Sequence, residues 1–418
     1  MSKDLVLIGG GHSHAIVLKM FGIKPLPGVR LTLISDVSHA PYSGMLPGHV
    51  AGFYDYDECH INLRSLAEFA QCQIFVDRAI AIDFNKNRVI CQNRPPVNFD
   101  LLSIDIGSTP ATLSVPGAAE YAIPAKPVPE FLANWNHLIS GRQNHPETPL
   151  RIAIVGGGAG GVELALNMQS RLTKEEGSSA TDFVADVADG CLVAGNELGR
   201  RKREGGLEGG LEGLLEIHLF HSGAELMAGH NRRVRQRLQE ILVSRGIQLH
   251  LMEQVCAVEK QQIIETKSES KILCKSGLEL KFDRIFWVTQ ASAANWIKES
   301  GLATDSNGFI QVNDCLRSIS HPHVFAAGDI CTMVNYPRPK AGVFAVRQGK
   351  PLFENLQQFL LGKSLKPFAP QSEYLGLIGT GNKRAIASRG NFMWESRLLW
   401  YWKDWIDRQF MKKFSNKN

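Results

Sequence analysis

The sequence of 418 residues has no pair of closely spaced cysteines and no long hydrophobic run. No two of its eight cysteines are separated by only two or four residues, which argues against a redox-active disulfide built on a close pair. Sparse cysteines without a pattern are also typical of a reducing compartment. The first apolar stretch, residues 5–8, is far too short for an export signal or a membrane span. We therefore expect a cytoplasmic protein without an export leader.

Charge and composition exclude further classes of protein. The net charge of +5 is mild, and a hydrophobic fraction of 44% is ordinary for a globular chain long enough for two domains and an appendage. Residues 172–214 differ, because they combine a basic cluster at 200–203 with a repeat rich in glycine and glutamate. This composition predicts a flexible surface insert without a core of its own. The acidic repeat beside the basic cluster argues against binding to nucleic acid.

Residues 9–14 (GGGHSH) form the first of two glycine-rich turns. A short apolar run precedes the turn and a helical pattern follows it, which is the context of a dinucleotide-binding motif. Gly9 and Gly11 let the backbone approach a pyrophosphate at the N-terminus of the helix. His14 stands where a third glycine is usual. We predict that His12 and His14 pack at the start of this helix, at the cofactor site, and hold no metal.

The next predicted strand, residues 29–34, ends in Ser35 and Asp36. An acidic side chain roughly 20 residues beyond the glycines commonly binds the ribose hydroxyls. Asp36 is therefore the candidate for this contact. Two alternatives stay open: Ser35 holds the equivalent place, or Asp36 is a plain surface residue of the turn.

The second turn, residues 156–161 (GGGAGG), is complete. Gly156, Gly158 and Gly161 have the spacing of the motif, and residues 151–155 read as the strand before it. Each such turn binds one dinucleotide. Two turns in one chain therefore indicate one dinucleotide that stays bound and one that exchanges, and a flavin with a nicotinamide is the natural pair.

The strand after the second turn is predicted at residues 216–220 and ends in His221 and Ser222. A site that prefers NADH usually has a carboxylate at this place, so the sequence lacks the group that would repel a 2′-phosphate. Four arginines follow: Arg232, Arg233, Arg235 and Arg237. Either one of them pairs with that phosphate, or they form a solvated basic face of a helix. The choice between NADH and NADPH stays open.

A third element, residues 324–329 (VFAAGD), reads as a buried strand with a polar exit. Asp329 at its end can accept a hydrogen bond from a sugar-like hydroxyl. Residues 341–360 are predicted to form a helix whose N-terminus faces an electron-rich ring edge.

With these elements in this order, the chain resembles the FAD-dependent pyridine nucleotide-disulfide oxidoreductase family over roughly residues 1–360. The match rests on the two turns, on residues 101–110 (LLSIDIGSTP) and on residues 324–329. It implies an α/β fold with two Rossmann-like dinucleotide-binding domains, each a three-layer ββα sandwich, and with the NAD(P) domain inserted in the FAD domain. We assign the domains as follows: FAD-binding 1–120 and 296–362, NAD(P)H-binding 121–295 with the flexible insert at 172–214, and a C-terminal region 363–418 with an amphipathic helix.

The resemblance also implies roles for individual residues. The resemblance places Glu163 near the nicotinamide. As a separate hypothesis, we expect Lys340 or the helix end beside it to steady negative charge on the reduced flavin. The other residues with counterparts at the flavin are Met45, Leu46 and Pro47 along the isoalloxazine, Ala79 at the adenine, Gly107 at the domain crossover, and Gly328 with Asp329 at the ribityl chain.

Two branches of this family are similar to the chain. One comprises the type II NADH dehydrogenases, which pass electrons to quinone; Val343 and Arg347 replace two of their glutamines, and Gln348 remains. The other is the flavoprotein module attached to selenide, water dikinase, matched at residues 41–48, 337–349 and 402–408. The implied function is hydride transfer from NADH or NADPH to FAD, followed by direct electron transfer to a quinone-like, selenium or sulfur acceptor. The alternative is a non-enzymatic or partner-dependent flavoprotein module of selenium metabolism, with the dikinase as partner.

The C-terminus is rich in aromatic and basic residues. Four of the seven tryptophans lie in residues 391–418, and apolar side chains recur there at helical spacing: Leu399, Trp402, Ile406, Phe410 and Phe414. A basic, aromatic amphipathic helix can lie at a lipid interface, and this one resembles the membrane-associated helices of type II dehydrogenases. The alternative is a helix that packs on the flavin domain or on a second subunit. We therefore expect a cytoplasmic protein that is either free or peripheral at the cytoplasmic face of a membrane.

Overall fold

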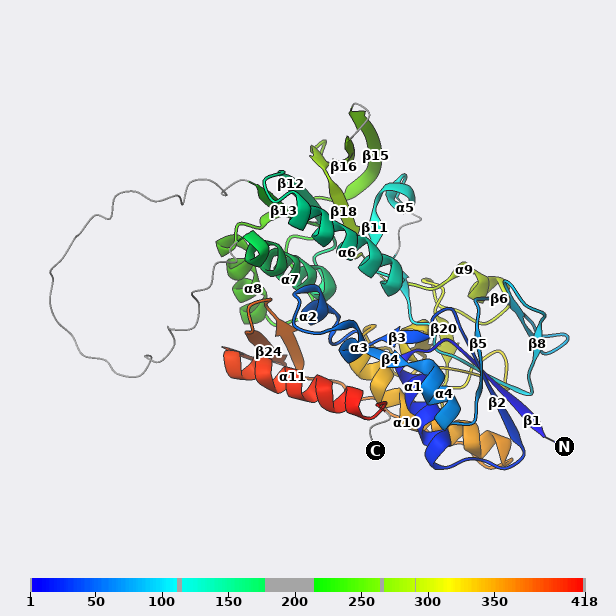
Figure 1. Cartoon of the computed structure of the whole chain (residues 1–418). Helices are drawn as coiled ribbons and strands as arrows, with labels where there is room; N and C mark the ends of the chain where they lie inside the picture. Colours follow the sequence, from blue (N-terminus) through cyan, green and yellow to red (C-terminus); the bar gives the residue numbers. More distant parts are fainter. Residues whose placement is uncertain (1, 111–114, 177–213, 264–266, 290, 416–418) are drawn as a thin grey trace, which may run out of the picture.

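The computed structural model describes residues 2–110, 115–176, 214–263, 267–289 and 291–415. The predicted surface insert lies almost wholly outside the described residues, as do its basic cluster and its repeat. Figure 1 shows two bodies in contact, with the C-terminal elements alongside both.

The first body is built on a parallel sheet of five strands, in the order β21-β9-β1-β2-β5. The strands are β1 (Lys3–Ile8), β2 (Val29–Ser35), β5 (Gln73–Val76), β9 (Leu101–Ile104) and β21 (Val324–Ala326). The central strands are continuous runs of buried side chains, because both faces of the sheet are covered. Helices cover one face: α1 (His12–Ile23), α4 (Leu63–Phe69) and α10 (Gly342–Leu360). The antiparallel sheet β6 (Ala79–Asp83), β7 (Arg88–Cys91) and β8 (Val97–Asn98) shares the same core.

The second body is built on another parallel sheet of five strands, in the order β11-β18-β12-β13-β14. The strands are β11 (Ile123–Pro124), β12 (Leu150–Val155), β13 (Leu215–His221), β14 (Gln248–Leu251) and β18 (Arg284–Trp287). Side chains alternate between the two faces of a strand, so β12 contributes to two separate cores. Ile152 and Ile154 pack under helices, whereas Ala153 and Val155 pack under an antiparallel sheet.

Those two outer layers complete the second sandwich. The helices are α6 (Val128–Asn144), α7 (Ala159–Glu176) and α8 (Arg232–Ser244), and the antiparallel strands are β15 (Val255–Ile263), β16 (Lys267–Cys274) and β17 (Glu279–Phe282). The chain leaves the first sheet after β9, builds the second body and returns to the first sheet at β21. The predicted fold class, with one dinucleotide-binding domain inserted in the other, is confirmed.

Short elements connect the two bodies and line their junction. They are β3 (His39–Pro41), α2 (Leu46–Val50), α3 (Tyr56–Cys59), β4 (His60–Asn62), β10 (Thr109–Pro110), α5 (Ala118–Tyr121), β19 (Ala291–Ser292), α9 (Asn295–Glu299), β20 (Ile310–Val312), the 3₁₀ turn η1 (Gly328–Ile330) and β22 (Cys331–Met333). Helix α2 packs against α7 of the second body. A segment of the first body therefore reaches the helix that follows the second glycine turn.

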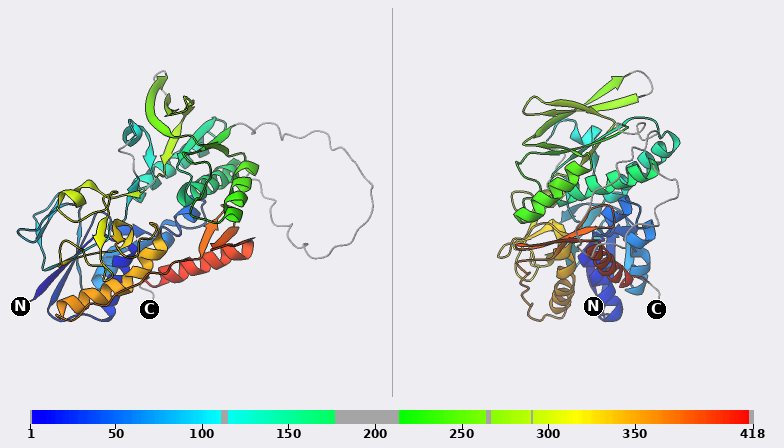
Figure 2. Two further views of the ribbon diagram at one scale, coloured as in Figure 1. Left: turned by 180° about the vertical axis from the view of Figure 1, so that it is seen from behind. Right: turned by 90° about the vertical axis from the view of Figure 1, so that its left-hand side faces the viewer.

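The C-terminal region forms an antiparallel sheet and a final helix. The sheet consists of β23 (Gly376–Gly379), β24 (Ala385–Arg389) and β25 (Phe392–Ser396), and α11 (Arg397–Lys412) follows. Figures 1 and 2 show this sheet beside the second body and α11 running from beneath the sheet to the first body. In the described part of the chain, none of the helices is both long and apolar enough to cross a bilayer.

The buried stripe of α11 differs from the predicted one. Three of the five predicted apolar residues, Leu399, Phe410 and Phe414, are buried, whereas Trp402 and Ile406 are exposed. Lys403 and Asp407 lie on the side of the helix that faces the protein. The prediction counted only apolar residues at helical spacing, and here an ion pair, Lys403 with Asp407, occupies the middle of the inner face.

Candidate functional site

A cavity of about 470 Å³ lies at the carboxyl ends of the strands of the first sheet. Its walls come from the residue or turn after each strand: Gly9 to His12 after β1, Asp36 after β2, Asp77 to Ala79 after β5, Asp105 to Thr109 after β9, and Asp329 after β21. Lys126 to Val128, at the start of the second body, close one side. Ligands of open α/β sheets bind in the crevice outside the carboxyl ends of the strands. The position and shape of the cavity therefore suit a dinucleotide.

The first glycine turn closes around the buried carboxylate of Asp105. Gly9 has a φ of +90°, a conformation that favours glycine. A Cβ on Gly9 would meet the backbone oxygen of Asp105, and a Cβ on Gly11 would meet its carboxylate. The backbone N–H groups of Ser13 and His14 donate hydrogen bonds to Asp105 Oδ2 at 2.9 and 3.1 Å. The N-terminus of α1 therefore already holds a carboxylate of the protein, beside the place predicted for a pyrophosphate.

Asp105 received no role from the sequence. Burial, and to a smaller extent the charge of Asp329, raise the pKa of its carboxyl group to about 7, although the hydrogen bonds from α1 lower it. The sequence did contain a signal for it, because Asp105 is the charged residue that directly follows a predominantly apolar strand. This segment was used only as evidence for the family resemblance. A buried carboxyl group that titrates near neutrality and lines a cavity is a candidate for function.

The two histidines of the first turn occupy different places. His14 is buried between α1 and β9, with Nδ1 2.7 Å from the oxygen of Gly9 and Nε2 2.8 Å from Ser103 Oγ. His14 does not line the cavity, whereas His12 does. Burial lowers the pKa of both rings to about 4, so both are neutral at pH 7. Among the described residues, no three His, Cys, Asp or Glu side chains are grouped to hold a metal ion.

One end of the cavity presents Asp36, Arg78 and Ala79. Asp36 is exposed and lies 3.7 Å from the guanidinium of Arg78. The hydroxyl of Ser35 instead donates to the backbone oxygen of Val37 at 2.9 Å, and Ser35 is buried. Of the two predicted alternatives, Asp36 thus has the freer side chain for a ribose hydroxyl.

The other end of the cavity contains Asp329 and a lysine that the sequence analysis missed. Lys126 Nζ lies 3.2 Å from Asp329 Oδ2 and donates to Ser108 Oγ at 3.1 Å. Gly107, with a φ of +70°, lines the wall beside them. Gly328 lies just behind, where its N–H donates to Gln348 Oε1 at 2.7 Å. The signal for Lys126 was its place between two prolines directly after β11, where the chain enters the second body.

Lys340, the lysine predicted for the flavin, has a different environment. Its Nζ donates to the backbone oxygen of Cys331 at 2.5 Å and to Thr332 Oγ1 at 3.0 Å, and it lies 3.9 Å from the centre of the Phe309 ring. Lys340 is absent from the residues that line the cavity. Burial lowers the pKa of its ammonium group. The placement favours Lys126 over Lys340 as the cation beside a bound flavin.

The remaining candidates lie at the junction of the two bodies. Met45 is fully buried and Leu46 packs on the core of the second body, so neither lines the cavity, and nor does Pro47. Glu163, in the first turns of α7, accepts a hydrogen bond from the N–H of Gly379 at 2.8 Å. Burial raises the pKa of Glu163. The carboxylate is thus already bound by the C-terminal sheet.

The second glycine turn is as tightly packed as its sequence suggests. Gly156 has a φ of +129°, and a Cβ there would lie 2.6 Å from the oxygen of Val288. A Cβ on Gly161 would meet the backbone oxygen of Gly156, which fixes the turn against the start of α7. A Cβ on Gly158 would meet nothing within 4 Å, so the backbone is open there to an approaching phosphate.

Two of the four arginines on α8 already have carboxylate partners. Arg235 pairs with Glu225, and Arg237 pairs with Glu240 and Glu395. Arg232 and Arg233 are exposed at the start of the helix. Within the described ranges of the chain, Arg232 and Arg233 lack the ion pairs that Arg235 and Arg237 make.

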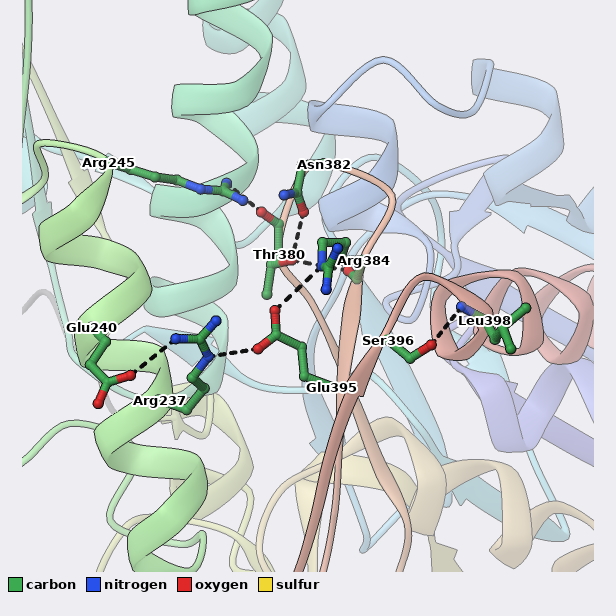
Figure 3. A network of polar contacts seen from close by, with 9 residues as sticks. All are labelled: Arg237, Glu240, Arg245, Thr380, Asn382, Arg384, Glu395, Ser396 and Leu398. Atoms are coloured by element: carbon green, nitrogen blue, oxygen red, sulfur yellow. Dashed lines mark hydrogen bonds and ion pairs between the residues drawn. The ribbon is translucent and has the colours of Figure 1, made fainter. Parts of the chain in front are cut away.

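Glu395 fastens the C-terminal sheet to the second body (Figure 3). Its carboxylate accepts a hydrogen bond from Arg237 Nε of α8 at 2.6 Å and lies 3.4 Å from Arg384 Nε. Arg245 Nη1 donates to the backbone oxygen of Thr380 at 2.5 Å. At the other end of this region, α11 is fastened to the first body. The C-terminal region therefore bridges the two bodies.

The attachment of α11 involves two buried side chains on its inner face. Lys403 Nζ donates to the backbone oxygen of Gly44 at 2.6 Å and to Asp407 Oδ2 at 2.7 Å. Asp407 Oδ1 accepts a hydrogen bond from the hydroxyl of Tyr42 at 3.0 Å. Ser43, between the two contacted residues, lines the cavity. Helix α11 thus holds one wall of the cavity in place.

A Glu395→Ala variant is expected to unfold at a lower temperature than the wild type. The change removes the carboxylate shared by Arg237 and Arg384, which should lower the free energy of unfolding by about 1–2 kcal/mol. Thermal unfolding followed by circular dichroism measures the change. Glu373→Ala is the control, because its pair with Arg389 is exposed and should contribute less than about 0.5 kcal/mol. Equal midpoints for the two variants would contradict the bridging role.

The chain is similar in sequence and in fold to known proteins. Residues 3–349 match the pyridine nucleotide-disulphide oxidoreductase family. The NADH dehydrogenase-like protein YutJ of Bacillus subtilis is 22% identical over 415 residues, which cover 96% of this chain and 99% of YutJ.

Two solved structures have a similar fold. The sulfide:quinone oxidoreductase of Aquifex aeolicus superposes with a TM-score of 0.74 at 17% identity, covering 100% of this chain and 92% of that chain. NDH2 from Plasmodium falciparum, in complex with NADH, has a TM-score of 0.75 at 14% identity, covering 99% and 98%. At these identities the likeness establishes the fold.

Proposed function

Because the chain belongs to the pyridine nucleotide-disulphide oxidoreductase family, we propose that it is a flavoenzyme that oxidises NADH or NADPH and reduces a quinone-like acceptor. FAD and a nicotinamide dinucleotide are its cofactors. The observation that carries the proposal is the pair of tightly packed glycine turns, each at the carboxyl edge of its own parallel sheet. The reaction balances as NAD(P)H plus a proton plus the acceptor giving NAD(P)⁺ and the acceptor reduced by two electrons and two protons.

The residues of the chain bind and orient the two dinucleotides. The flavin, when bound, supplies the hydride and electron chemistry. Gly9, Gly11 and His12 would surround its pyrophosphate, Asp36 would bind the ribose, and Asp329 would bind the ribityl chain. The second turn would bind the phosphates of the nucleotide, with Glu163 beside the nicotinamide. The eight cysteines include no close pair, so electrons would leave the flavin without a disulfide relay.

The buried Cys331 argues against a thiol relay at the flavin. Cys331 lies two residues after Asp329, but it does not line the cavity. Burial raises the pKa of its thiol to about 12, and Sγ lies 3.5 Å from the oxygen of Gly328. The thiolate is the reactive form, and it is scarcely populated at neutral pH under these conditions.

Lys126→Met is expected to lower the midpoint potential of the bound flavin. The ammonium group lines the cavity and favours negative charge on a reduced ring, so its loss makes reduction harder. A loss of about 1–2 kcal/mol corresponds to roughly 20–40 mV for a two-electron couple. Lys340→Met is the matched control, because Lys340 binds Cys331 and Thr332 instead of lining the cavity. A potential lowered by Lys340→Met alone would restore the assignment made from sequence.

The acceptor side of the proposal rests on YutJ and on the sulfide:quinone oxidoreductase, whose names state NADH dehydrogenase-like and quinone activities. Gln348, the remaining glutamine of the quinone-binding pattern, is buried and accepts the N–H of Gly328. It therefore supports the flavin loop in this structure. The acceptor would be a small molecule that reaches the flavin directly.

The outer face of α11 favours contact with a membrane surface. We define the outer stripe as Leu398, Tyr401, Trp402 and Trp405, which are 69%, 52%, 45% and 57% exposed. Their spacing places them on one side of the helix, opposite the buried Leu399, Asp407 and Phe410. Aromatic side chains on a helix with basic neighbours are typical of interfacial helices. We infer that α11 rests on the lipid surface, where a quinone would be available.

Replacing Trp402 and Trp405 together by glutamate is expected to reduce binding to phospholipid vesicles by at least about tenfold. Each change removes a large apolar group from the lipid interface and adds a charge. Co-sedimentation with vesicles measures the loss. Val243→Glu, at a residue of α8 that is 59% exposed, is the control for an added surface charge. Unchanged co-sedimentation of the double variant would contradict the docking of α11.

An anaerobic titration with NADH and, separately, NADPH tests the central proposal. Rapid bleaching of the visible absorption of the flavin is the expected result with one of the two nucleotides, and it also identifies the preferred one. If FAD is bound but neither nucleotide reduces it, the proposed dehydrogenase function is overturned. That outcome would favour the partner-dependent flavoprotein, for which the link to selenide, water dikinase rests on the sequence resemblance alone.

A further inference from the structure

A second hollow, of about 810 Å³, lies between four helices and away from the first glycine turn. Helices α1, α4 and α10 contribute Ile16 and Met20, Phe69, and Val346 to its lining, and Phe414 follows the end of α11. In Figures 1 and 2 these helices run together on the side of the first body where α11 ends. The groove thus has an apolar floor that no segment of the described chain covers.

The rim of this groove is basic. Lys19 comes from α1, Lys350 from α10, and Lys412 and Lys413 from the end of α11, while Glu68 is the one acidic residue in the lining. Among the described residues, Lys350 lies 3.9 Å from the carboxylate of Glu354, and the other three lysines have no carboxylate within 4 Å. Lys19 Nζ is held 4.4 Å from the centre of the Phe69 ring, at the edge of the floor. Positive charge and apolar surface therefore meet in one hollow.

The groove continues the outer stripe of α11. Trp402 and Trp405 are followed at helical spacing by Gln409 and then by Lys412, so Lys412 lies on the same side of the helix as the exposed tryptophans. Lys412 is itself part of the rim. A helix at the membrane interface thus lies beside a groove with a basic rim and an apolar floor. An amphiphile in the membrane surface could bind its charged headgroup at the rim and its apolar chain at the floor.

We propose that this groove binds one anionic phospholipid molecule of the membrane surface, with the headgroup phosphate at the lysines and an acyl chain along the apolar floor. The proposal rests on the membrane docking proposed above and specifies the lipid. The four lysines outnumber the single glutamate, so the groove complements a net negative headgroup and discriminates against a zwitterionic one. A free phosphate ester would use only the rim and leave the floor exposed to water.

Binding of short-chain lipids to the full chain with its FAD tests the proposal. The probes are dioctanoyl phosphatidylglycerol, dioctanoyl phosphatidylcholine and glycerol 3-phosphate, each titrated calorimetrically below micellar concentrations. We expect saturable binding of one phosphatidylglycerol, and binding of the other two that is weaker by at least about tenfold. The variant Lys19→Gln/Lys350→Gln should weaken phosphatidylglycerol binding by about tenfold. Lys260→Gln/Lys275→Gln, which removes two exposed lysines of the second body, should leave it unchanged.

Three results would overturn the groove as a lipid site. The first is an equal loss of phosphatidylglycerol binding in both lysine variants, which would indicate diffuse electrostatic attraction. The second is equal affinity for phosphatidylcholine and phosphatidylglycerol. The third is a chain that binds no lipid and instead self-associates. The double glutamate variant of Trp402 and Trp405 keeps every residue of the groove. Unchanged vesicle co-sedimentation of this variant, with phosphatidylglycerol binding retained, would therefore contradict only the membrane placement of α11. Reduced co-sedimentation of the variant, with no phosphatidylglycerol binding by the wild type, would contradict only the groove.

Discussion

A Gly161→Ala variant is expected to keep its FAD and to lose rapid reduction by nicotinamide nucleotides. The added Cβ would collide with the backbone oxygen of Gly156, so either the turn or the start of α7 must shift. Overpacking of this kind costs roughly 1–3 kcal/mol. Since each 1.4 kcal/mol changes an affinity tenfold, the nucleotide should bind about 10–100 times more weakly. The cavity proposed for FAD lies on the first sheet and does not include Gly161.

Single-turnover reduction at increasing nucleotide concentrations measures this loss. The expected result is a higher concentration for half-maximal rate, with the visible spectrum of bound FAD unchanged. Gly229→Ala is the matched control in the same domain, because Gly229 is exposed, has no positive φ and has no atom within 4 Å of an added Cβ. A Gly161→Ala variant that is reduced like the wild type would contradict the second turn as the nucleotide site.

The fold could be predicted from local sequence patterns, and the structure contains the elements that these patterns indicate. Apolar runs such as residues 5–8 and 152–155 are buried strands, and the glycines after them have the positive φ or the close contacts that the motif requires at Gly9, Gly156 and Gly161. Those features depend on neighbours in the sequence, so a single chain reveals them. The acidic exits Asp36 and Asp329 were visible for the same reason.

The parts that the sequence did not reveal depend on contacts between distant segments. Lys126 meets Asp329 across 203 positions, and Asp105 meets the start of α1 across more than 90. Lys340 was predicted at the flavin from its place before α10, but its ammonium group donates a hydrogen bond to the backbone oxygen of Cys331. The inner face of α11 was predicted correctly at Leu399, Phe410 and Phe414 but not at its centre, which is an ion pair between Lys403 and Asp407. The spacing of apolar residues cannot predict an ion pair on the inner face of a helix.

The buried carboxyl group of Asp105 gives the second large prediction, a pH dependence. Its ordinary pKa of 3.8 is raised to about 7 by burial. The folded protein therefore holds this proton more tightly than the unfolded chain does, and the stabilising effect is present at low pH and is lost as pH rises toward 7. A shift of about three units corresponds to roughly 4 kcal/mol across that window. Asp105→Asn should remove this part of the pH dependence.

Bound FAD should move the titration of Asp105 further upward. The pyrophosphate predicted at the first turn adds negative charge beside a carboxyl group that already faces Asp329. Binding of FAD would then take up a proton above pH 7, and the affinity should fall by up to about tenfold per pH unit from pH 7 toward pH 9. His12 and His14, with pKa values near 4, stay neutral throughout this range.

Release of FAD from diluted holoenzyme, followed by flavin fluorescence between pH 6.5 and 9, measures this dependence. The wild type should release more FAD as pH rises, whereas Asp105→Asn should be nearly independent of pH, because the amide cannot ionise and its oxygen can still accept the N–H groups of Ser13 and His14. Asp100→Asn, at an exposed carboxylate outside the cavity, is the control and should follow the wild type. The same slope in Asp105→Asn would place the titrating group elsewhere. A flat Asp105→Asn profile would mean that a carboxyl group of the protein shares the N-terminus of α1 with the cofactor. Glycine at positions 11 and 328 leaves room for this carboxyl group, because a Cβ on either residue would collide with it.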